Sequence, residues 1–179
     1  MVKDNNKNIT LRALEPSDID FLFDIENDTN LWKYSNRSTP YSKHLLLDYI
    51  KNSSKDIFES RQIKFAISDS KNVTLGFIDL YDFEPMHRRA AIGLVVDNSK
   101  RSMGIGSLSL DLIELYAKNQ LFLNQLYANI ASENKSSVSL FKKHKFTQSG
   151  KKIQWNFYDG NYHDEYIFQK LIWVKKYFF

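Results

Sequence analysis

One stretch decides how the chain is interpreted: Val95-Val96-Asp97-Asn98-Ser99-Lys100-Arg101-Ser102-Met103-Gly104-Ile105-Gly106-Ser107-Leu108. Its first residues end an apolar run over 92–96, which is typical of a buried strand. Its last residues begin a helical face, because apolar side chains recur at Ile105, Leu108, Leu112 and Leu115. A strand that leads through a glycine turn into a helix gathers free backbone N–H groups and the positive end of the helix dipole. The stretch therefore predicts a site for a phosphate-bearing ligand.

The two glycines of this turn narrow the kind of site. Glycine has no Cβ, so a phosphate can approach the backbone closely. The third glycine of a dinucleotide-binding fingerprint is absent, since position 109 is Ser109, and no Gly-Lys-Ser/Thr follows as in a P-loop. The turn Arg101-x-x-Gly104-x-Gly106 therefore predicts an anion cradle of another kind.

The composition indicates one globular domain. The chain has 179 residues, of which 42% are hydrophobic, and this length can bury a sizeable core. The absence of cysteine excludes disulfides, thiolate metal sites and cysteine nucleophiles. No apolar run has the length of a membrane span, and the polar residues 1–8 do not resemble a secretory signal. We expect a single domain over 1–179, in the cytoplasm and without membrane association.

Charge and histidine content argue against two further classes. The net charge of +4 is spread along the chain, and the short run His87-Arg88-Arg89 lacks interleaved aromatic residues, so no nucleic-acid partner is expected. The four histidines do not have the spacing of a metal site, so no metal is expected. A small anionic cofactor would account for the positive charge equally well.

The remaining pattern predicts a mixed α/β domain. Helices are expected after Pro16, after Ser42, and over about 104–118 and 134–144, while 27–34 is expected to be a loop with a short aromatic end. Three consecutive strands favour antiparallel pairing, whereas the strand–helix–strand unit over 92–130 favours a parallel pair. Strands are expected over 9–14, 63–67, 74–83, 88–96, 125–130, 146–158 and 161–171, the last two joined by a hairpin at Asp159-Gly160-Asn161.

A second motif carries a resemblance to a known family: Asn134-x-x-Ser137-x-x-Leu140-Phe141-x-x-x-Lys145-Phe146. Together with the glycine turn, it resembles the signatures of the GCN5-related N-acetyltransferases (GNAT) over nearly the whole chain. Stretches 80–90 and 159–165 are most similar to bacterial spermidine/diamine N-acetyltransferases and ribosomal-protein alanine acetyltransferases. The resemblance implies a mixed, mostly antiparallel central sheet with a parallel splayed pair, flanked by helices on both faces.

The resemblance also implies acetyl-CoA as the co-substrate, with no metal. The backbone of Leu94, Val95 and Val96 would pair with the pantetheine arm, and Asn134 would hydrogen-bond the cofactor. The alternatives are a plain core strand for the first three residues and a helix cap for Asn134. The pyrophosphate would be held by Lys100, Arg101, Ser102, Met103, Gly104, Ile105 and Gly106.

Phe141 departs from the family pattern. The family usually has a tyrosine here, whose hydroxyl protonates the departing thiolate, and Phe141 cannot do so. A thiol has a pKa of about 8.5, so a thiolate can leave without full protonation and we expect slower turnover, not its loss. Tyr127 or Tyr158 could substitute as the acid. Phe141 itself is expected to contact the cofactor.

The acceptor amine also needs a proton acceptor, because alkyl amines have a pKa near that of lysine, roughly 10.4. Simple alternation places Asp79 and Asp82 on opposite faces of a strand unless a bulge intervenes. Polyamine acetyltransferases tend to carry a carboxylate on the next strand, where this chain has Ala91. We predict Asp82 and Glu84 as the acceptor-side carboxylates, acting directly or through water; solvated loop charges are the alternative.

These observations favour an acetyl-CoA-dependent N-acetyltransferase that acts on a primary amine of a small polyamine or diamine. Two alternatives keep the chemistry and change the acceptor to a protein N-terminus, as in ribosomal-protein acetylation, or to an aminoglycoside. A third is an acyl-CoA-binding module with weakened catalysis. The sequence leaves a homo-oligomer open.

Overall fold

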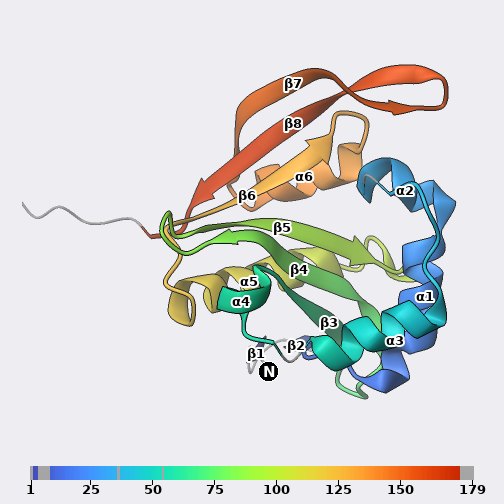
Figure 1. Ribbon diagram of the computed structural model, residues 1–179. Coiled ribbons are helices and arrows are strands. Elements are labelled where there is room, and N and C mark those ends of the chain that lie inside the picture. Colours follow the sequence, from blue (N-terminus) through green and yellow to red (C-terminus); the bar gives the residue numbers. More distant parts are fainter. Residues whose placement is uncertain (1, 4–8, 36, 54, 174–179) are drawn as a thin grey trace, which may run out of the picture.

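The computed structural model describes residues 2–3, 9–35, 37–53 and 55–173 (Figure 1). These residues form an eight-stranded sheet in the order β1-β2-β3-β4-β5-β6-β8-β7. The strands are β1 (Val2–Lys3), β2 (Ile9–Arg12), β3 (Ile63–Asp69), β4 (Thr74–Glu84), β5 (Arg89–Val96), β6 (Gln125–Ala131), β7 (Thr147–Tyr158) and β8 (Asn161–Leu171).

The sheet is antiparallel except at one pair of strands. β5 and β6 run parallel, and the helix α5 (Ile105–Asn119) lies between them in sequence. Every other neighbouring pair is antiparallel, including the long hairpin of β7 and β8. The mostly antiparallel sheet with one parallel pair, expected from the sequence, is therefore confirmed.

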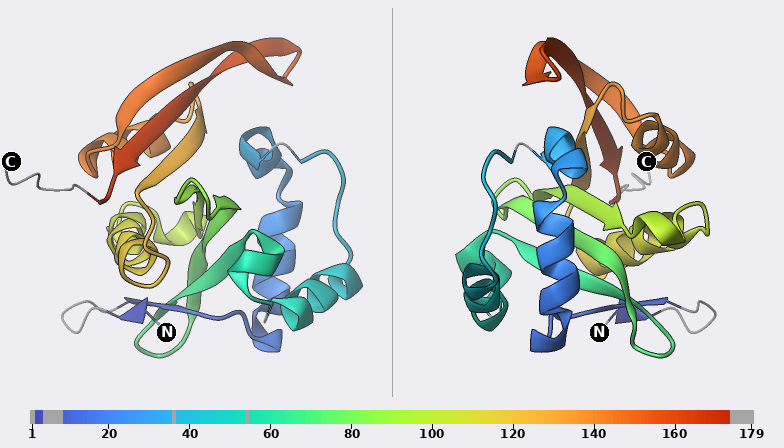
Figure 2. Two further views of the ribbon diagram at one scale, coloured as in Figure 1. Left: turned by 60° about the vertical axis from the view of Figure 1, so that its left-hand side comes forward. Right: turned by 90° about the vertical axis from the view of Figure 1, so that its right-hand side faces the viewer.

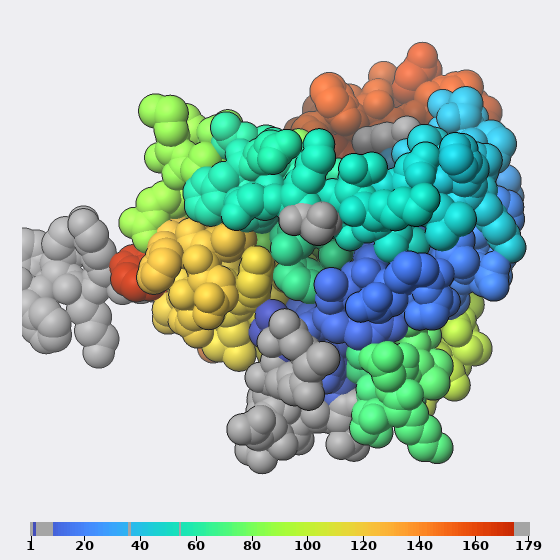
Figure 3. Space-filling model, turned by 60° about the horizontal axis from the view of Figure 1, so that its bottom comes forward, coloured from blue at the N-terminus to red at the C-terminus, as the bar shows by residue number. Residues whose placement is uncertain are grey.

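Helices cover both faces of the sheet, as Figure 2 shows. On one face, α1 (Ile19–Asn27) and α3 (Lys43–Asn52) bury Leu22, Leu46 and Ile50 against Ala66 and Phe77 of the sheet. On the other face, the larger core is formed with α5, α6 (Lys135–Lys143) and the short helix α4 (Ile57–Ser60). Figure 3 shows α3 (cyan) beside α1 (blue) on the outer surface, with the end of α5 (yellow) to their left.

Local capping explains where several helices begin. Ser42 accepts a hydrogen bond from the Leu45 N–H (3.2 Å) at the start of α3, and Asn134 accepts one from the Ser137 N–H (3.1 Å) at α6. Before α1, a 3₁₀ turn (Pro16–Asp18) places a proline at its first position. These are the starts that the sequence pattern predicts.

Two short helices differ from the expectation. Residues predicted as a loop form α2 (Thr29–Ser35), and α4 was not predicted. Asp28 accepts a hydrogen bond from the Asn30 N–H (2.9 Å), and the Trp32 indole donates to the Glu26 carbonyl (3.0 Å), so α2 is held from the end of α1. Because these hydrogen bonds, and not a regular apolar face, hold α2, the sequence shows no apolar periodicity that would predict it. The β7–β8 hairpin extends over this helix (Figure 1).

Candidate active site

The parallel pair β5–β6 is short, and the two strands then separate. Their register ends at the pair Ala91 and Tyr127. Beyond it β5 continues beside β4 and β6 continues beside β8. Backbone N–H and C=O groups of residues 92–96 and 128–131 then face each other without a strand ladder between them, although such groups need partners. We call these diverging edges the splay. Leu94, Val95 and Val96 lie along it, where the cofactor arm was predicted.

The glycine turn lies at the open end of the splay. Gly104 has a φ of 79° and immediately precedes α5, and a Cβ added there would meet no atom within 4 Å. A Cβ on Gly106 would lie 3.3 Å from Leu140 of α6 and 3.5 Å from Leu94 of β5. The first turn of α5 therefore packs against both elements that border the splay, and its free N–H groups can meet an anion there.

The predicted cradle residues are not equivalent. Arg101, Ser102, Met103 and Gly104 are exposed, and Lys100 is half-buried, so all can face a ligand. Ile105 is buried in the core, so only its backbone N–H can take part. The open space at Gly104, the exposed Arg101 and the half-buried Lys100 fit the pyrophosphate of the implied co-substrate.

Two side chains of the second motif were predicted to contact the cofactor: Asn134 caps a helix, and Phe141 is buried. The Asn134 carbonyl oxygen caps α6, as the helix-cap alternative predicted, and its amide NH₂ group remains available to a ligand. Phe141 is 3% exposed and packs edge-on against Phe146, with ring centroids 4.9 Å apart. The Phe141 ring is therefore part of the core, and only its edge could border the cofactor.

The two tyrosines considered as substitute acids both donate to carboxylates. The Tyr127 hydroxyl donates a hydrogen bond to Asp82 (3.3 Å). The pKa of Tyr127 is raised above its usual value, mainly by burial and secondly by the Asp82 carboxylate. Tyr158 donates to Glu133 (3.3 Å), and burial together with Glu133 raises the pKa of Tyr158 to about 12. Raised pKa values keep both hydroxyls protonated but weaken them as proton donors.

Asp82 and Glu84 have different neighbours. A bulge interrupts the β4–β5 register between Tyr81 and Glu84, and Asp82 has a φ of 47° within it. Asp82 is exposed beside Tyr127, at the closed end of the splay. Glu84 lies 3.8 Å from Arg61, the residue that follows α4. A bulge was needed to bring Asp79 and Asp82 to one face of the strand, and a bulge is present. Asp82 and Glu84, however, contact different elements.

A charged cluster that the sequence analysis did not assign lies under α1 and α3. Lys64 of β3 pairs with Asp79 of β4 across the sheet, on the face that carries Ala66 and Phe77. The Lys64 ammonium reaches the Glu26 carboxylate of α1 at 2.8 Å. The signal in the sequence is a charged residue at a core-facing position of each of two apolar strands.

A cavity of about 480 Å³ opens beside this cluster, between α1, α3, β3 and β4. Its lining combines three carboxylates, two cations and two tyrosines: Glu26, Asp48, Asp79, Arg37, Lys64, Tyr41 and Tyr49. Neither Asp82 nor Glu84 is among its described lining residues. We call this space the acidic cavity.

Burial and charge set the protonation of the cluster. Burial raises the pKa of Asp79 above its ordinary value, although the Lys64 cation opposes this shift. Burial alone would lower the pKa of Lys64, but Asp79 and Glu26 together hold it above its usual range. Lys64 is therefore a fixed cation beside a carboxylate that is easier to protonate than an exposed one.

Small residues on β5 let side chains of β4 reach the splay. Asp79 is paired with Gly93, where a Cβ would lie 2.6 Å from an Asp79 carboxylate oxygen. Tyr81 is paired with Ala91, and its hydroxyl is hydrogen-bonded to Asn129 of β6. Burial and the Asp79 charge raise the pKa of Tyr81 to about 12. Asp79 thus lies beside Gly93, just past Ala91, the last residue at which β5 pairs with β6.

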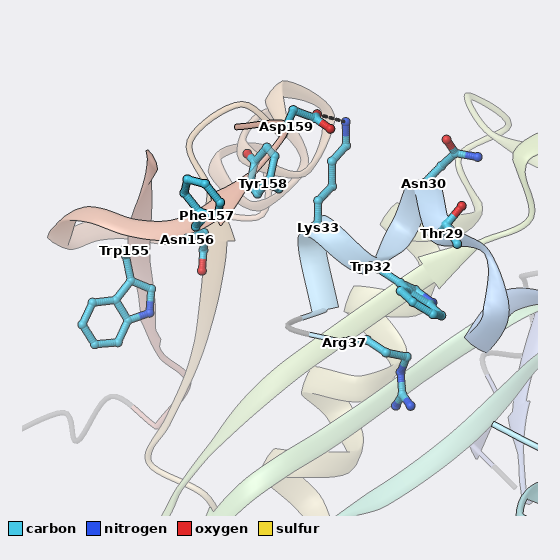
Figure 4. A pocket seen from close by; sticks show the side chains of 10 residues that line it. All are labelled: Thr29, Asn30, Trp32, Lys33, Arg37, Trp155, Asn156, Phe157, Tyr158 and Asp159. Atoms are coloured by element: carbon cyan, nitrogen blue, oxygen red, sulfur yellow. Dashed lines mark ion pairs between the residues drawn. The ribbon is translucent and has the colours of Figure 1, made fainter. Parts of the chain in front are cut away.

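A second cavity, of about 570 Å³, separates α2 from the β7–β8 hairpin. Figure 4 shows Lys33 reaching from α2 toward Asp159 at the hairpin tip, with Nζ and a carboxylate oxygen 4.0 Å apart. Arg37 lines both cavities, stacks on Tyr41 and lies 3.5 Å from Glu26. The two cavities therefore meet at Arg37, with aromatic walls on the outer one.

Two classes of feature are absent from the part of the chain that the structure describes. No described helix is long and apolar enough to cross a membrane. Within the same residues, no cluster of three or more histidine, aspartate or glutamate side chains has the arrangement of a metal site.

Comparison with known families gives one match. The family described as "Acetyltransferase (GNAT) domain" matches residues 8–147. This range contains the parallel pair, the glycine turn and α6, together with both α1 and α3.

Individual relatives are similar at modest identity. The chain is 26% identical over 159 residues to the spermidine N(1)-acetyltransferase of Vibrio cholerae, which is 89% of this chain and 90% of that protein. The crystal structure of spermidine N-acetyltransferase from Vibrio cholerae in complex with CoA and spermine superimposes with a TM-score of 0.84, at 23% identity over 93% of this chain and 96% of that one. A dodecameric structure of the Vibrio cholerae enzyme has a TM-score of 0.76 at 25% identity, over 93% and 95% of the two chains.

Proposed function

The chain belongs to the GNAT acetyltransferase family, and on this premise we propose that it transfers the acetyl group of acetyl-CoA to a primary amine of a small polyamine or diamine. Membership makes the chain an N-acetyltransferase. The observation that carries the proposal is the splay, whose open end meets the glycine turn and whose closed end meets the acidic cavity. The two reactants would thus approach one another from opposite sides of the sheet.

The cofactor side of the proposal rests on backbone geometry. Leu94, Val95 and Val96 would pair with the pantetheine arm, in the manner of an added strand. The turn over 100–106 would hold the pyrophosphate on the N-terminus of α5, with the amide of Asn134 as a further donor. Phe141 would border this site with its ring edge and supply no proton.

The acceptor side rests on charge and shape. A polyamine is a flexible chain of ammonium groups, and carboxylates and tyrosine rings are the groups that recognise such cations. The acidic cavity supplies both, with Glu26, Asp48, Asp79, Tyr41 and Tyr49 in its lining. The relatives named as spermidine acetyltransferases support the same substrate class. We also propose a homo-oligomer, by likeness to the dodecameric Vibrio cholerae enzyme.

The chemistry requires loss of a proton from the amine before it attacks the thioester carbonyl carbon, after which the C–S bond breaks. Donors aimed at the carbonyl oxygen stabilise the charge that develops there, and backbone N–H groups of the splay edge can serve. Asp82 remains a proposed acceptor-side carboxylate because it is exposed at the closed end of the splay. Glu84, beside Arg61, is proposed only to shape the electrostatic potential of that end.

The substrate class is tested by thiol release from acetyl-CoA with a panel of amines. The panel contains diamines, spermidine and spermine, together with an aminoglycoside and a peptide with a free N-terminus. The proposal expects release with the di- and polyamines and little with the other two. Release with only the peptide or only the aminoglycoside would replace the substrate class, and binding of acetyl-CoA without any release would favour a module with weakened catalysis.

A further inference from the structure

Asp79 differs from Asp82, which accepts a hydrogen bond from Tyr127, in having no hydrogen-bond donor among the described residues. Within the described residues, its carboxylate is influenced by burial and by the charges of Lys64 and Glu26, and no group donates a hydrogen bond to it. The Lys64 ammonium instead reaches Glu26 at 2.8 Å. A partly buried carboxylate without a donor from the protein depends on water or on a ligand for its hydrogen bonds.

The position of Asp79 shows which ligand could do so. Its carboxylate lines the acidic cavity, and it also lies over Gly93, at the point where β5 leaves β6. It is therefore reached from the cavity on one side and from the splay on the other. Asp82 lies at the closed end of the splay but is not among the described residues that line the acidic cavity, and it already accepts a hydrogen bond from Tyr127.

The geometry points to Asp79 as the residue that binds the acceptor ammonium and takes its proton, with Lys64 as a positioning residue. This inference rests on the proposed function, because it assumes an amine acceptor on this side of the sheet. It adds the residue that selects a primary amine, in place of Asp82 or Glu84.

The proton transfer can be written in full. The ammonium of the acceptor binds as a hydrogen-bond donor to the Asp79 carboxylate and gives it one proton, which leaves a neutral amine. The amine nitrogen forms the new C–N bond to the acetyl carbon while the C–S bond breaks, and the second nitrogen proton goes to the departing thiolate. Asp79 then returns its proton to solvent through the cavity, so that acetyl-CoA and ammonium become amide, thiol and one proton.

The charged groups around Asp79 fit a proton acceptor. Lys64 faces it from β3, Glu26 from α1, Tyr49 from α3 and Tyr81 from its own strand. From β5 it faces Gly93, which has no charge. Burial raises the pKa of Asp79 and so makes it a stronger base than an exposed carboxylate, while the Lys64 cation favours its ionised form and limits this rise.

The first test compares Asp79→Asn with the wild-type enzyme on the best amine of the panel. Loss of a general base lowers turnover by about 100-fold or more, and kcat/KM for the amine is expected to fall by that factor. The dissociation constant for acetyl-CoA, measured by calorimetry, is expected to stay unchanged and shows that the variant is folded. Asp24→Asn, an exposed carboxylate on α1, is the matched control and is expected to retain wild-type rates.

The second test follows the pH profile, which a merely structural role would not move. In the wild type, kcat/KM is expected to fall on the acidic side as Asp79 is protonated, and this limb disappears in Asp79→Asn. Lys64→Met removes the opposing cation, so the limb is expected to move to higher pH, whereas Lys64→Arg restores it. Should Lys64→Met fail to fold, the double variant Glu26→Gln/Lys64→Met removes both buried charges, and the limb is expected to move in the same direction but by less, because Glu26 raises the pKa of Asp79 and its loss opposes the loss of Lys64.

The outcomes separate this inference from the proposed function. Wild-type turnover with an unaffected Asp79→Asn would overturn the role of Asp79 and leave the enzyme activity intact. Loss of the acidic limb in Asp82→Asn, with Asp79→Asn retaining it, would transfer the role to Asp82. Absence of turnover with every amine would reject the proposed function itself, and the inference with it.

Discussion

The two sides of the splay are built in different ways. On the cofactor side, the strand edge and the glycine turn are contiguous in sequence over 94–106, and Asn134 adds one further contact. On the acceptor side, Glu26, Tyr49, Lys64 and Asp79 come from four separate elements. A site made of one continuous segment is visible as a motif, whereas a site made by strand register becomes visible only in the folded sheet.

The difference has a physical origin. A positive φ and close approach to a phosphate are requirements on single residues, and glycine meets them at Gly104. The acceptor side depends instead on the row formed by Lys64, Asp79 and Gly93 across three strands. A shift of one residue in the register of any of these strands would turn its member of the row to the opposite face of the sheet.

The largest effect is expected where a substitution weakens both sides together. Asp18 and Arg12 form a buried ion pair at 2.7 Å, so Asp18→Asn is expected to lower the free energy of unfolding by about 3–5 kcal/mol. Urea titration measures this loss. Turnover and acetyl-CoA binding should then decline in parallel as the temperature rises, and a selective loss of one would contradict a purely structural role.

The same pair predicts how stability depends on pH. Burial would raise the pKa of Asp18, but hydrogen bonds from Arg12, Thr74 and the Glu15 N–H hold it below its ordinary value. A lowered pKa means that the stabilisation is present at neutral pH and is lost as the pH falls below the ordinary value toward the folded value. Asp18→Asn should remove this part of the acid dependence.

A second comparison uses two glycines of the sheet and tests the acceptor side alone. In Gly93→Ala the three atoms nearest to the new Cβ belong to the Asp79 carboxylate group, the closest at 2.6 Å, so this flexible side chain can move and stability should change little. Turnover is expected to fall by about 100-fold, as for loss of a proton acceptor.

Gly76→Ala provides the control for that substitution. Its Cβ would clash with the Val95 carbonyl oxygen, which belongs to the backbone and cannot move aside. Overpacking of this kind costs about 1–3 kcal/mol or more in the free energy of unfolding. Equal effects of the two alanines on turnover, at a temperature where both variants are folded, would reject the special role of Gly93.

A third comparison isolates the cofactor side. Gly104→Ala and Gly160→Ala each place a Cβ in open space at a positive φ, 79° and 74°, so each should cost about 1–2 kcal/mol of stability. Only Gly104 lies in the glycine turn, where the pyrophosphate is proposed to bind. Calorimetry is expected to show acetyl-CoA affinity reduced about tenfold, roughly 1.4 kcal/mol, in Gly104→Ala and unchanged in Gly160→Ala. An equal loss in both would mean that the turn does not hold the cofactor.

The smallest expected effect concerns Phe141, which borders the cofactor side. Phe141→Tyr restores a hydroxyl that can protonate the departing thiolate, and we expect kcat to rise by less than the roughly 100-fold of well-placed general acid catalysis, because the Phe141 ring is buried in the core. Stopped-flow detection of the thiol measures it. No rise, with acetyl-CoA still tightly bound, would favour the module with weakened catalysis.

The sequence predicts the fold well where patterns are local. The strand that ends at Val96, the helix that follows Gly104 and the cap at Asn134 are all confirmed. The helices α2 and α4 were not predicted, because each is shorter than two or three turns and is held by contacts such as Trp32 to Glu26. Asp79 was recognised as acidic but was not assigned, since its role depends on Lys64 and Gly93, which alternation within one strand cannot reveal.

A proton-accepting role for Asp79 is tested most directly by the turnover of Asp79→Asn on two amines of similar shape and different basicity. One is a simple alkyl amine, protonated at neutral pH, and the other is its trifluorinated analogue, which is largely neutral there. If Asp79 takes the acceptor proton, the variant is expected to lose about 100-fold on the first amine and only a small factor on the second. An equal loss on both amines would contradict a proton-accepting role for Asp79.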